Sequence, residues 1–459
     1  MSGVSPQPAQ ERELATVAAA ESSIPFVQAV RFWLRLGFIS FGGPAGQIAI
    51  MHQELVGQRR WISEQRFLHA LNYCMLLPGP EAQQLATYIG WLMHRTLGGI
   101  VAGTLFVLPS LLILIALSWL YVSFGELPWV AALFYGVKAA VTAIILQAAH
   151  RLGNRTLHSP LLWAIAGSAF VAIAVFELPF PAIVAAAALI GHLADRVTPG
   201  QFAAGNLPSH SAGSSGAALI DDDTPPPSHA RFRWQRFVRS MVIGLLLWGA
   251  SIGLLTLNFG WQHTLTQMGW FFTKAALLTF GGAYAVLPYV HQGAVEQFGW
   301  LTQTQMMSGL ALGETTPGPL IMVVAFVGFV GGHGKALFGP DALFLAGAAA
   351  ATLVTWFTFL PSFLFILAGG PLVESTRGKL GYTAPLTAIT AAVVGVILDL
   401  VLFFARATLW PHGFSGSFDW LSALITLGAA IALLHYRRTT IEVIAGCALA
   451  GLLGQVLPV

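Results

Sequence analysis

Apolar stretches long enough to cross a membrane recur along this 459-residue chain, from residue 26 to residue 458. A membrane-spanning helix needs about 20 mostly apolar residues. Only 9% of the residues are charged, whereas a soluble domain carries about 25%, so the bilayer is the expected solvent. We predict an all-α polytopic membrane protein with about 10–13 transmembrane helices. The candidate segments are 26–50, 67–93, 98–122, 129–149, 161–177, 179–195, 236–257, 268–290, 305–331, 342–370, 385–405, 421–435 and 440–458.

Two halves of the chain carry the same motifs in the same order, which indicates a duplication rather than recurrent generic membrane patterns. We expect a cytoplasmic tail over 1–25, an N-terminal repeat over 26–196, a flexible linker over 197–235, and a C-terminal repeat with an additional leading helix over 236–459. The paired motifs are Phe41-Gly42-Gly43 with Phe280-Gly281-Gly282, His52-Gln53 with His291-Gln292, Pro78-Gly79-Pro80 with Pro317-Gly318-Pro319, and, after a short insertion, Leu108-Pro109 with Leu360-Pro361.

Lysine and arginine accumulate in cytoplasmic loops, so their distribution predicts orientation. The bias favours a cytoplasmic N-terminus, and seven segments then separate loop 51–66 from its copy at 291–304. The two repeats are therefore predicted to be inverted, as in many secondary transporters. Loop 51–66 carries Arg59, Arg60 and Arg66 on the outer side in this arrangement, against the bias. Either the local topology differs, or the segment draws an anion toward its path.

Paired glycines and proline-glycine-proline motifs interrupt apolar segments at equivalent places in both halves. Such glycines either pack helices closely or break them, and paired breaks point to a substrate site. Two prolines around a glycine kink a helix or open a new one, and a helix N-terminus offers free N–H groups to an anion. The expected pathway residues here are Phe41, Gly42, Gly43, Pro78, Gly79, Pro80, Gly281, Gly282, Thr316, Pro317, Gly318 and Pro319.

Ionisable residues within apolar segments are costly and are usually functional. Arg35 and Lys274 are repeat equivalents that would place a cation before each glycine pair, unless they extend to the membrane interface. Arg60 is a further candidate for the anion path. No metal-ligand spacing and no disulfide framework are evident, so we expect neither metal nor cofactor. The candidates for proton coupling are Glu81, Glu314, Glu54, His52 and Asp399, although a carboxylate after Pro80 also suits the helix dipole.

These motifs resemble those of the chromate ion transporter (CHR) family. The first half resembles it over 38–47, 52–56, 60–61 and 77–82, and the second half over 279–284 and 316–320. The resemblance implies a two-domain exporter in the bacterial inner membrane that lowers cytoplasmic chromate and confers resistance, driven by the proton gradient. Its implied partners are chromate, protons and lipid, without nucleic acid; a homodimer is compatible with it. The long linker departs from the family pattern.

Three other functions stay open at this point. Sulfate has nearly the shape and charge of chromate, so a transporter or exchanger of sulfate or another oxyanion is the first alternative. An anion channel would need neither a coupling acid nor an inverted repeat. A membrane enzyme is the third, but the sequence has no aspartate-rich magnesium cluster, no nucleophile beside a base and no haem-spaced histidine pair. We therefore expect a transporter without catalytic residues.

Overall fold

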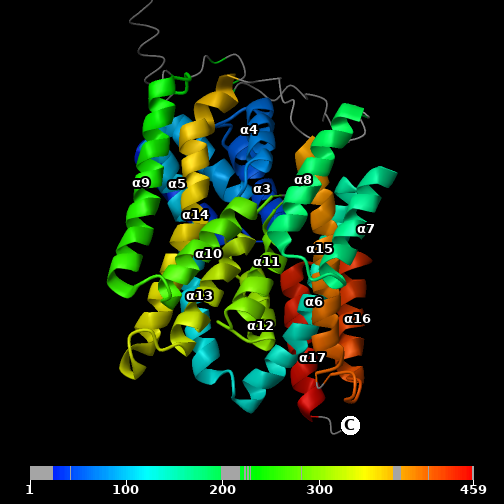
Figure 1. Cartoon of the computed structure of the whole chain (residues 1–459). Coiled ribbons are helices and arrows are strands. Elements are labelled where there is room, and N and C mark those ends of the chain that lie inside the picture. The colour runs from blue at the N-terminus through cyan, green and yellow to red at the C-terminus, as the bar shows by residue number, and fades with distance from the viewer. Residues whose placement is uncertain are drawn as a thin grey trace, which may run out of the picture.

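A computed structural model of the chain describes residues 24–41, 43–197, 218–221, 224, 227, 229–280, 282–375, 384–411 and 413–456. These residues are helical or irregular, apart from one isolated β-bridge. Long helices extend between two ends of the molecule (Figure 1). The prediction of an all-α protein with several membrane-length helices is confirmed, because five helical segments are long and apolar enough to cross a membrane: Glu81–Phe124, Pro128–Thr156, Trp234–Phe259, Pro340–Glu374 and Ala384–Leu409.

The first half contains seven α-helices within the described residues. Side-chain oxygens of Ser63 and Ser159 cap the N-termini of α4 and α7, and Pro128 suits the first turn of α6 because that turn needs no N–H there. The helices are α2 (Phe26–Ile39), α3 (Gly43–His52), α4 (Glu64–Leu76), α5 (Glu81–Phe124), α6 (Pro128–Thr156), α7 (Pro160–Ala174) and α8 (Phe180–Val197), with a π-helical turn over Gln53–Gln58.

One end of the molecule, which we call the linker end, is where described linker residues contact the first half. Ile62 and Ile220 form the parallel β-bridge, and the Ser63 N–H donates to the Ile220 carbonyl (3.0 Å). His229 Nε2 lies 3.0 Å from the Trp91 carbonyl oxygen. The predicted linker is therefore attached to the first repeat at these points. Residues 1–23 and 198–217 lie outside the described part of the chain.

Helices α2 and α3 form a hairpin that starts and finishes at the linker end. At its start, the Ile24 carbonyl oxygen lies 2.8 Å from His94 Nε2, three residues along α5 from the linker contact at Trp91. At its tip, the Ser40 carbonyl accepts a hydrogen bond from Gly318 of the other repeat. Helix α3 and the π-helical turn then lead back to the linker end at Ile62.

A second hairpin consists of α4 and the first part of α5. Helix α4 begins beside Ser63 at the linker end, the chain breaks at 77–80, and the first part of α5 returns to Trp91. There α5 turns sharply, with Arg95 at φ 56°. Gly90 lies against Gly98 and Ala102, since a Cβ at Gly90 would be 2.5 Å from the Ala102 Cβ. Residues 96–124 then run the length of the molecule.

Helix α9 (Trp234–Phe259) carries the chain from the linker end to the opposite end, where the second half begins. We call this the distal end; Gly331, Trp300 and Met268 meet there, a Cβ at Gly331 being 2.6 Å from Met268 Cε and 3.0 Å from Trp300 Cβ. The other helices are α10 (Thr264–Leu278), α11 (Leu287–His291), α12 (Gln303–Thr315), α13 (Val323–Gly334), α14 (Leu343–Ser375), α15 (Ala384–Leu409), α16 (Trp420–Leu434) and α17 (Thr440–Val456). Short helical turns cover Ala283–Val286, Gln292–Gln297, Leu320–Met322 and Pro340–Ala342.

Of the two alternatives for loop 51–66, the structure favours a different local topology, because the loop contacts the linker. Segments 26–50 and 67–93 were expected to cross the membrane once each, but both turn back at a break near the centre. Loop 51–66 consequently shares the linker end with 218–230. Segments 268–290 and 305–331 likewise fold back, which puts loop 291–304 at the distal end. Hydropathy alone does not distinguish a re-entrant hairpin from two crossings, because both are apolar.

Candidate functional site

Two reciprocal hydrogen bonds join the repeats at the centre of the molecule. The Gly79 N–H donates to the Thr279 carbonyl at 2.8 Å, and the Gly318 N–H donates to the Ser40 carbonyl at 2.8 Å. Gly79 and Gly318 occupy the same position of the two repeats, and so do Ser40 and Thr279, at the offset that relates the glycine-rich motifs. The four residues mark the crossing of the two repeats, and we refer to it as the central site.

The proline-glycine-proline motifs create a helix opening on each side of this crossing. Helix α4 ends at Leu76 and α5 begins at Glu81, immediately after Pro80. In the second half α12 ends at Thr315, and a helical turn leading into α13 begins after Pro319. Gly79 and Gly318 have φ values of +124° and +101°, which only glycine adopts without strain. The predicted breaks therefore occur, and each presents the N–H groups of a first helical turn.

Two serines that the sequence analysis did not select complete the central site. Ser110 and Ser362 follow the paired Leu108-Pro109 and Leu360-Pro361 motifs, so they are repeat equivalents. The Ser362 hydroxyl lies where a Cβ of Gly79 would clash with it, and a Cβ at Gly318 would be 2.6 Å from the Ser110 Cβ. Each repeat thus places a serine against the helix opening of the other repeat.

Neither serine hydroxyl has a hydrogen-bond partner among the described residues. Ser110 is 0% exposed and Ser362 is 1% exposed. A buried hydroxyl without a partner lowers the stability of the fold by about 1–3 kcal/mol. Two such groups at equivalent positions therefore do not act as ordinary core residues, which stabilise the fold. They are the residues that the sequence reasoning missed. The repeated Leu-Pro pair was noticed, but the polar residue after it was the signal that would have identified them.

Two glutamine side chains add further polar atoms to the central site. Gln47 Nε2 donates to the Gly318 carbonyl, and Gln84 Nε2 donates to the Pro78 carbonyl at 2.8 Å. The Oε1 atoms of both side chains are buried without a partner within the described structure. These amides orient the two glycine turns, and their uncommitted oxygens can accept a hydrogen bond from a protonated ligand or from water.

Two carboxylates flank the crossing at positions that are not repeat equivalents. Glu81 is the first residue of α5, is half-buried, and interacts electrostatically with Arg155. Glu314 is 8% exposed near the end of α12. Its carboxylate accepts a hydrogen bond from the Tyr284 hydroxyl at 2.6 Å. The helix openings and the two serines thus have repeat equivalents, whereas the two acids and the two glutamines do not.

The remaining glycine-motif residues lie at the breaks that bring the chain to the crossing. Phe41 and Gly43 follow Ser40, and Gly43 has φ +68°. Gly282, at φ +104°, starts the helical turn after Thr279. Gly42 and Gly281 lie outside the described residues. The Thr316 hydroxyl donates to the Gly313 carbonyl at 3.0 Å, so its proton is already committed to the end of α12.

The predicted cations Arg35 and Lys274 are exposed and lie five residues before Ser40 and Thr279, respectively. Neither forms an ion pair with a described carboxylate. Lys274 Nζ lies 6.0 Å from the centre of the Trp270 ring. The positions are consistent with either role predicted for them, an approach path or an interfacial anchor.

Several other predicted residues belong to the linker end rather than to the central site. His52 Nε2 lies 2.6 Å from Glu64 Oε2, and Glu54 pairs with Arg59 at 3.3 Å. Arg60 is exposed, and its carbonyl accepts a hydrogen bond from Leu219 at 3.0 Å. Asp399 is half-buried on α15. The structure therefore brings only Glu81 and Glu314, of the five acid and histidine candidates, to the two helix breaks.

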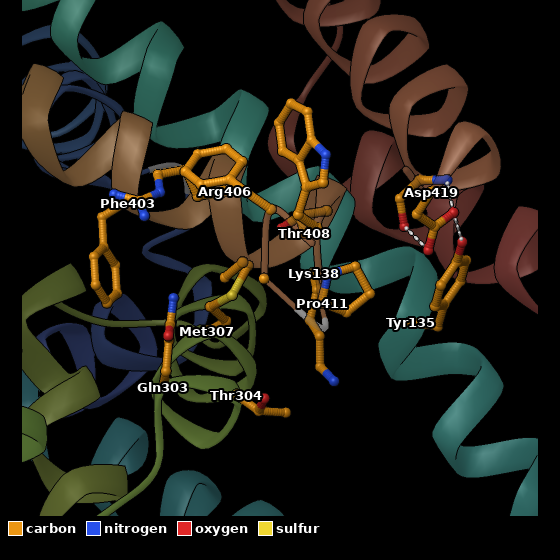
Figure 2. Close-up of a pocket in the computed structure, with 15 residues that line it drawn as sticks. Tyr135, Lys138, Gln303, Thr304, Met307, Phe403, Arg406, Thr408, Pro411 and Asp419 are labelled. Carbon is orange, nitrogen blue, oxygen red and sulfur yellow. Dashed lines mark hydrogen bonds between the residues drawn. The ribbon is translucent and has the colours of Figure 1, made fainter. Parts of the chain in front are cut away.

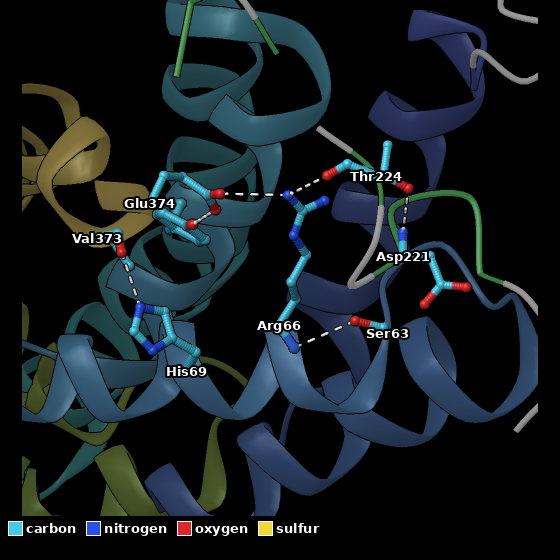
Figure 3. Close-up of polar contacts among 8 residues, drawn as sticks. Ser63, Arg66, His69, Asp221, Thr224, Val373 and Glu374 are labelled. Carbon is cyan, nitrogen blue, oxygen red and sulfur yellow. Dashed lines mark hydrogen bonds and ion pairs between the residues drawn. The ribbon is translucent and has the colours of Figure 1, made fainter. Parts of the chain in front are cut away.

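Arg66 is buried at the linker end, where it joins the two repeats and the linker (Figure 3). Its guanidinium lies 3.4 Å from the Glu374 carboxylate, and both side chains are 3% exposed. The same group donates to the Thr224 carbonyl at 3.0 Å, and the Tyr88 hydroxyl donates to Glu374. This buried ion pair ties α4 to the end of α14.

A family model described as "Chromate transporter" matches residues 27–192 and again residues 266–452. The two matches cover both repeats and leave out the linker and α9. The chain belongs to the chromate transporter family. The matched ranges contain the four residues of the reciprocal hydrogen bonds together with Ser110 and Ser362, so the central site of this family member lies within the family regions.

Relatives of this chromate transporter family chain cover its whole length. It is 31% identical over 456 residues to a chromate transport protein of Cupriavidus metallidurans, with 99% of each chain covered. It is 34% identical over 401 residues to a chromate transport protein of Pseudomonas aeruginosa, covering 86% of this chain and 84% of that protein. An uncharacterized transporter of Bacillus subtilis, YwrA, is 26% identical over 159 residues, which are 34% of this chain and 89% of that protein. No solved structure matches.

The residues that the structure describes contain no group of three or more histidine, cysteine, aspartate or glutamate side chains suited to a metal. In this transporter family member the central site instead has the first turns of two helices and two partner-free serine hydroxyls as its donors. Uncharged donors of this kind bind a fully ionised oxyanion by hydrogen bonding, and they do so without a permanent ion pair that would hold it too tightly to release.

Proposed function

We propose that this chain is a secondary transporter that exports chromate from the bacterial cytoplasm across the inner membrane and confers chromate resistance. The observation that carries the proposal is the pair of reciprocal hydrogen bonds at Gly79 and Gly318, which places each helix opening against the other repeat, beside a partner-free serine hydroxyl of that repeat. A tetrahedral dianion has four oxygens to satisfy. Two N-terminal helix turns and two hydroxyls, contributed equally by both repeats, supply matching donors.

The two repeats are, on this proposal, related by inverted topology. Supporting it, the first-half hairpins start and finish at the linker end, and the second-half hairpins at the distal end. Alternating access then follows from movement of one repeat against the other around the central site. Positive residues gather at the linker end, which makes that end cytoplasmic: Arg59, Arg60, Arg66, Arg95, Arg231, Arg233, Arg236 and Arg239.

Coupling to protons is assigned to Glu81, with Glu314 in a related role. Glu81 opens the half-helix whose N-terminus faces the anion. An ionised Glu81 and a dianion repel each other across a poorly hydrated gap, so protonation of Glu81 favours anion binding. Glu314 accepts a hydrogen bond from the Tyr284 hydroxyl, next to the second break. The two acids are not repeat equivalents, so their surroundings differ between the inward-facing and the outward-facing state. The proton affinity of the transporter therefore differs between these two states.

The test is radiolabelled chromate flux in inverted membrane vesicles, with and without an imposed proton gradient and with sulfate as competitor. We expect saturable, gradient-dependent accumulation in inverted vesicles, which corresponds to export. The control is a Gly318→Leu variant that inserts normally. Accumulation of sulfate without inhibition by chromate would point to the sulfate transporter, and rapid unsaturable flux independent of the gradient would point to a channel; either result contradicts the proposal.

A further inference from the structure

A pocket of about 660 Å³ is lined by residues beside loop 291–304 at the distal end, and none of the central-site residues is part of its lining (Figure 2). The start of α12 contributes Gln303 and Thr304, and the end of α15 contributes Arg406. Lys138 of α6 extends into the open space between the labelled residues. The pocket thus takes its polar side chains from both repeats and is large enough for an anion with part of its hydration shell.

The pocket contains two cations, Lys138 and Arg406, and one carboxylate, Asp419. Lys138 is half-buried and Arg406 stacks on Phe414, its Cζ 4.6 Å from the ring centre. Neither cation forms an ion pair within the described part of the chain. The nearby carboxylate of Asp419 accepts hydrogen bonds from Tyr135 and Ser422 instead. Burying part of a lysine without a counter-charge is costly unless an anion or water satisfies it.

Asp419 is held by three hydrogen bonds on its own side of the pocket. Its carboxylate accepts from the Tyr135 hydroxyl at 2.6 Å, from the Ser422 N–H at 2.9 Å and from the Ser422 hydroxyl at 3.1 Å. It serves as the N-terminal cap of α16. These donors orient the carboxylate toward Tyr135 and Ser422, and its negative charge leaves the three charged lining residues, Lys138, Arg406 and Asp419, with a net charge of +1.

The two cations are peculiar to one end of the protein. When α6 is aligned with α15 through the repeat Leu-Pro offset, Lys138 corresponds to Thr390 and Arg406 corresponds to Asn154. The duplication therefore does not account for Lys138 and Arg406. The equivalent positions at the linker end carry uncharged residues, so they do not form a second positive pocket there. Such a difference suits a role that only one side of a transporter performs.

We propose that this pocket is a second oxyanion site, a vestibule that holds a divalent tetrahedral oxyanion such as sulfate or chromate at the distal mouth of the pathway. This proposal takes one element from the proposed function, namely that the anion is a tetrahedral oxyanion; the site itself is argued from the pocket. The phosphate of an anionic lipid has the same chemistry, and the soluble ion is favoured because the lining combines cations with Gln303, Thr304 and Thr408, which suit a hydrated ion.

Equilibrium binding of radiolabelled sulfate to the purified full-length protein tests the proposal. We expect two sites in the wild type. The Lys138→Gln/Arg406→Gln variant should lose the site that is more sensitive to ionic strength and keep the other, because exposed charges are screened strongly by salt. Ser110→Ala/Ser362→Ala should do the reverse. Lys335→Gln, which removes an exposed distal charge outside the pocket, is the matched control and should keep both sites.

Unchanged stoichiometry in the Lys138→Gln/Arg406→Gln variant overturns the vestibule. Failure of the proposed function is a separate result, namely two normal sites without chromate flux. The lipid source is distinguished by repeating the titration in nanodiscs of phosphatidylglycerol and of phosphatidylcholine. Loss of the salt-sensitive site only in phosphatidylglycerol would assign the pocket to a lipid headgroup and overturn the assignment to a soluble ion. In transport, the variant should raise the half-saturation about tenfold only for substrate offered from the distal side.

Discussion

Replacing Ser110 and Ser362 with alanine should weaken anion binding without weakening the fold. A hydrogen bond from a hydroxyl to a charged group contributes about 1.5–3 kcal/mol, and about 1.4 kcal/mol corresponds to tenfold in affinity. Each single variant should therefore raise the dissociation constant for chromate about 10- to 100-fold. The double variant should lose still more, because each hydroxyl belongs to a different repeat.

The same substitutions should leave the stability of the ligand-free protein equal or higher. Both hydroxyls are buried without a partner in the described structure, and such a group costs about 1–3 kcal/mol. Alanine removes this cost and leaves almost the same volume. A serine that merely stabilised the fold would behave in the opposite way, since its loss would lower the unfolding temperature.

Thermal unfolding in detergent, with and without chromate, measures both quantities in one assay. A ligand at 100 times its dissociation constant stabilises a protein by about 2.7 kcal/mol, so weaker binding appears as a smaller chromate-induced shift. Ser118→Ala is the matched control. Its hydroxyl is equally buried and partner-free on α5, but it lies eight residues from Ser110, which is about 12 Å along the helix. Wild-type chromate shifts in the serine variants, or a loss of stability in ligand-free protein, would refute the reasoning.

Three further expectations concern topology, packing and coupling. Gln58→Cys and Gln297→Cys, at equivalent positions of the two repeats, should react with an impermeant thiol reagent from opposite sides of the membrane. Reaction of both variants from the same side would exclude inverted repeats. Both native cysteines are buried, so they should not react with the reagent. Gly79→Ala should cost about 2–6 kcal/mol of stability through φ +124° and a clash with a buried hydroxyl, whereas Gly57→Ala, which meets open space, should melt nearly like wild type. Glu81→Gln should still exchange anion but lose its dependence on the proton gradient in vesicles at several pH values. Wild-type dependence would shift the coupling role to Glu314 or Asp399.

Local chemistry was enough to predict the helix breaks. Proline lacks an N–H and fixes φ, so two prolines around a glycine at Pro78–Pro80 favour a break, whereas single prolines such as Pro109 and Pro361 lie inside continuous helices. The repeat of the same pattern at Pro317–Pro319 predicted a second break, and the structure has both. The family was likewise predictable from these motifs, which lie in both of the ranges that the family model matches.

The side of loop 51–66 was not predictable, because apolar length sets only the solvent of a segment. Whether segment 26–50 crosses the membrane or folds back as a hairpin depends on the residues that its central break contacts. Here Ser40 meets Gly318, which lies 278 residues further along the chain. That contact exists only once both repeats are folded. The correction also removes the conflict over Arg59, Arg60 and Arg66, which now lie at the same end as the arginines of the linker.

The serine pair escaped sequence reasoning for a related reason. A lone serine within an apolar helix usually bonds to the carbonyl four residues earlier, as Ser40 does with Leu36 at 2.6 Å. Ser110 and Ser362 lack that bond, and each instead faces a glycine turn of the opposite repeat. Sequence spacing within one repeat cannot reveal a contact between repeats, but equivalence at the offset of the Leu-Pro pair can direct attention to it.

The combination of symmetric donors and asymmetric acids bears on how transport is driven. On the proposed function, an anion bound by the two helix openings and by Ser110 and Ser362 has nearly the same ligands toward both ends, because exchange of the repeats interchanges these groups. Direction must therefore come from groups without a repeat equivalent. Glu81 corresponds to Leu320, and Glu314 corresponds to Met75. Gln47 and Gln84 also lack equivalents, since they correspond to Val286 and Val323, but only the two carboxylates can change charge. On the proposed function, a difference in their protonation is therefore what gives the carrier a direction.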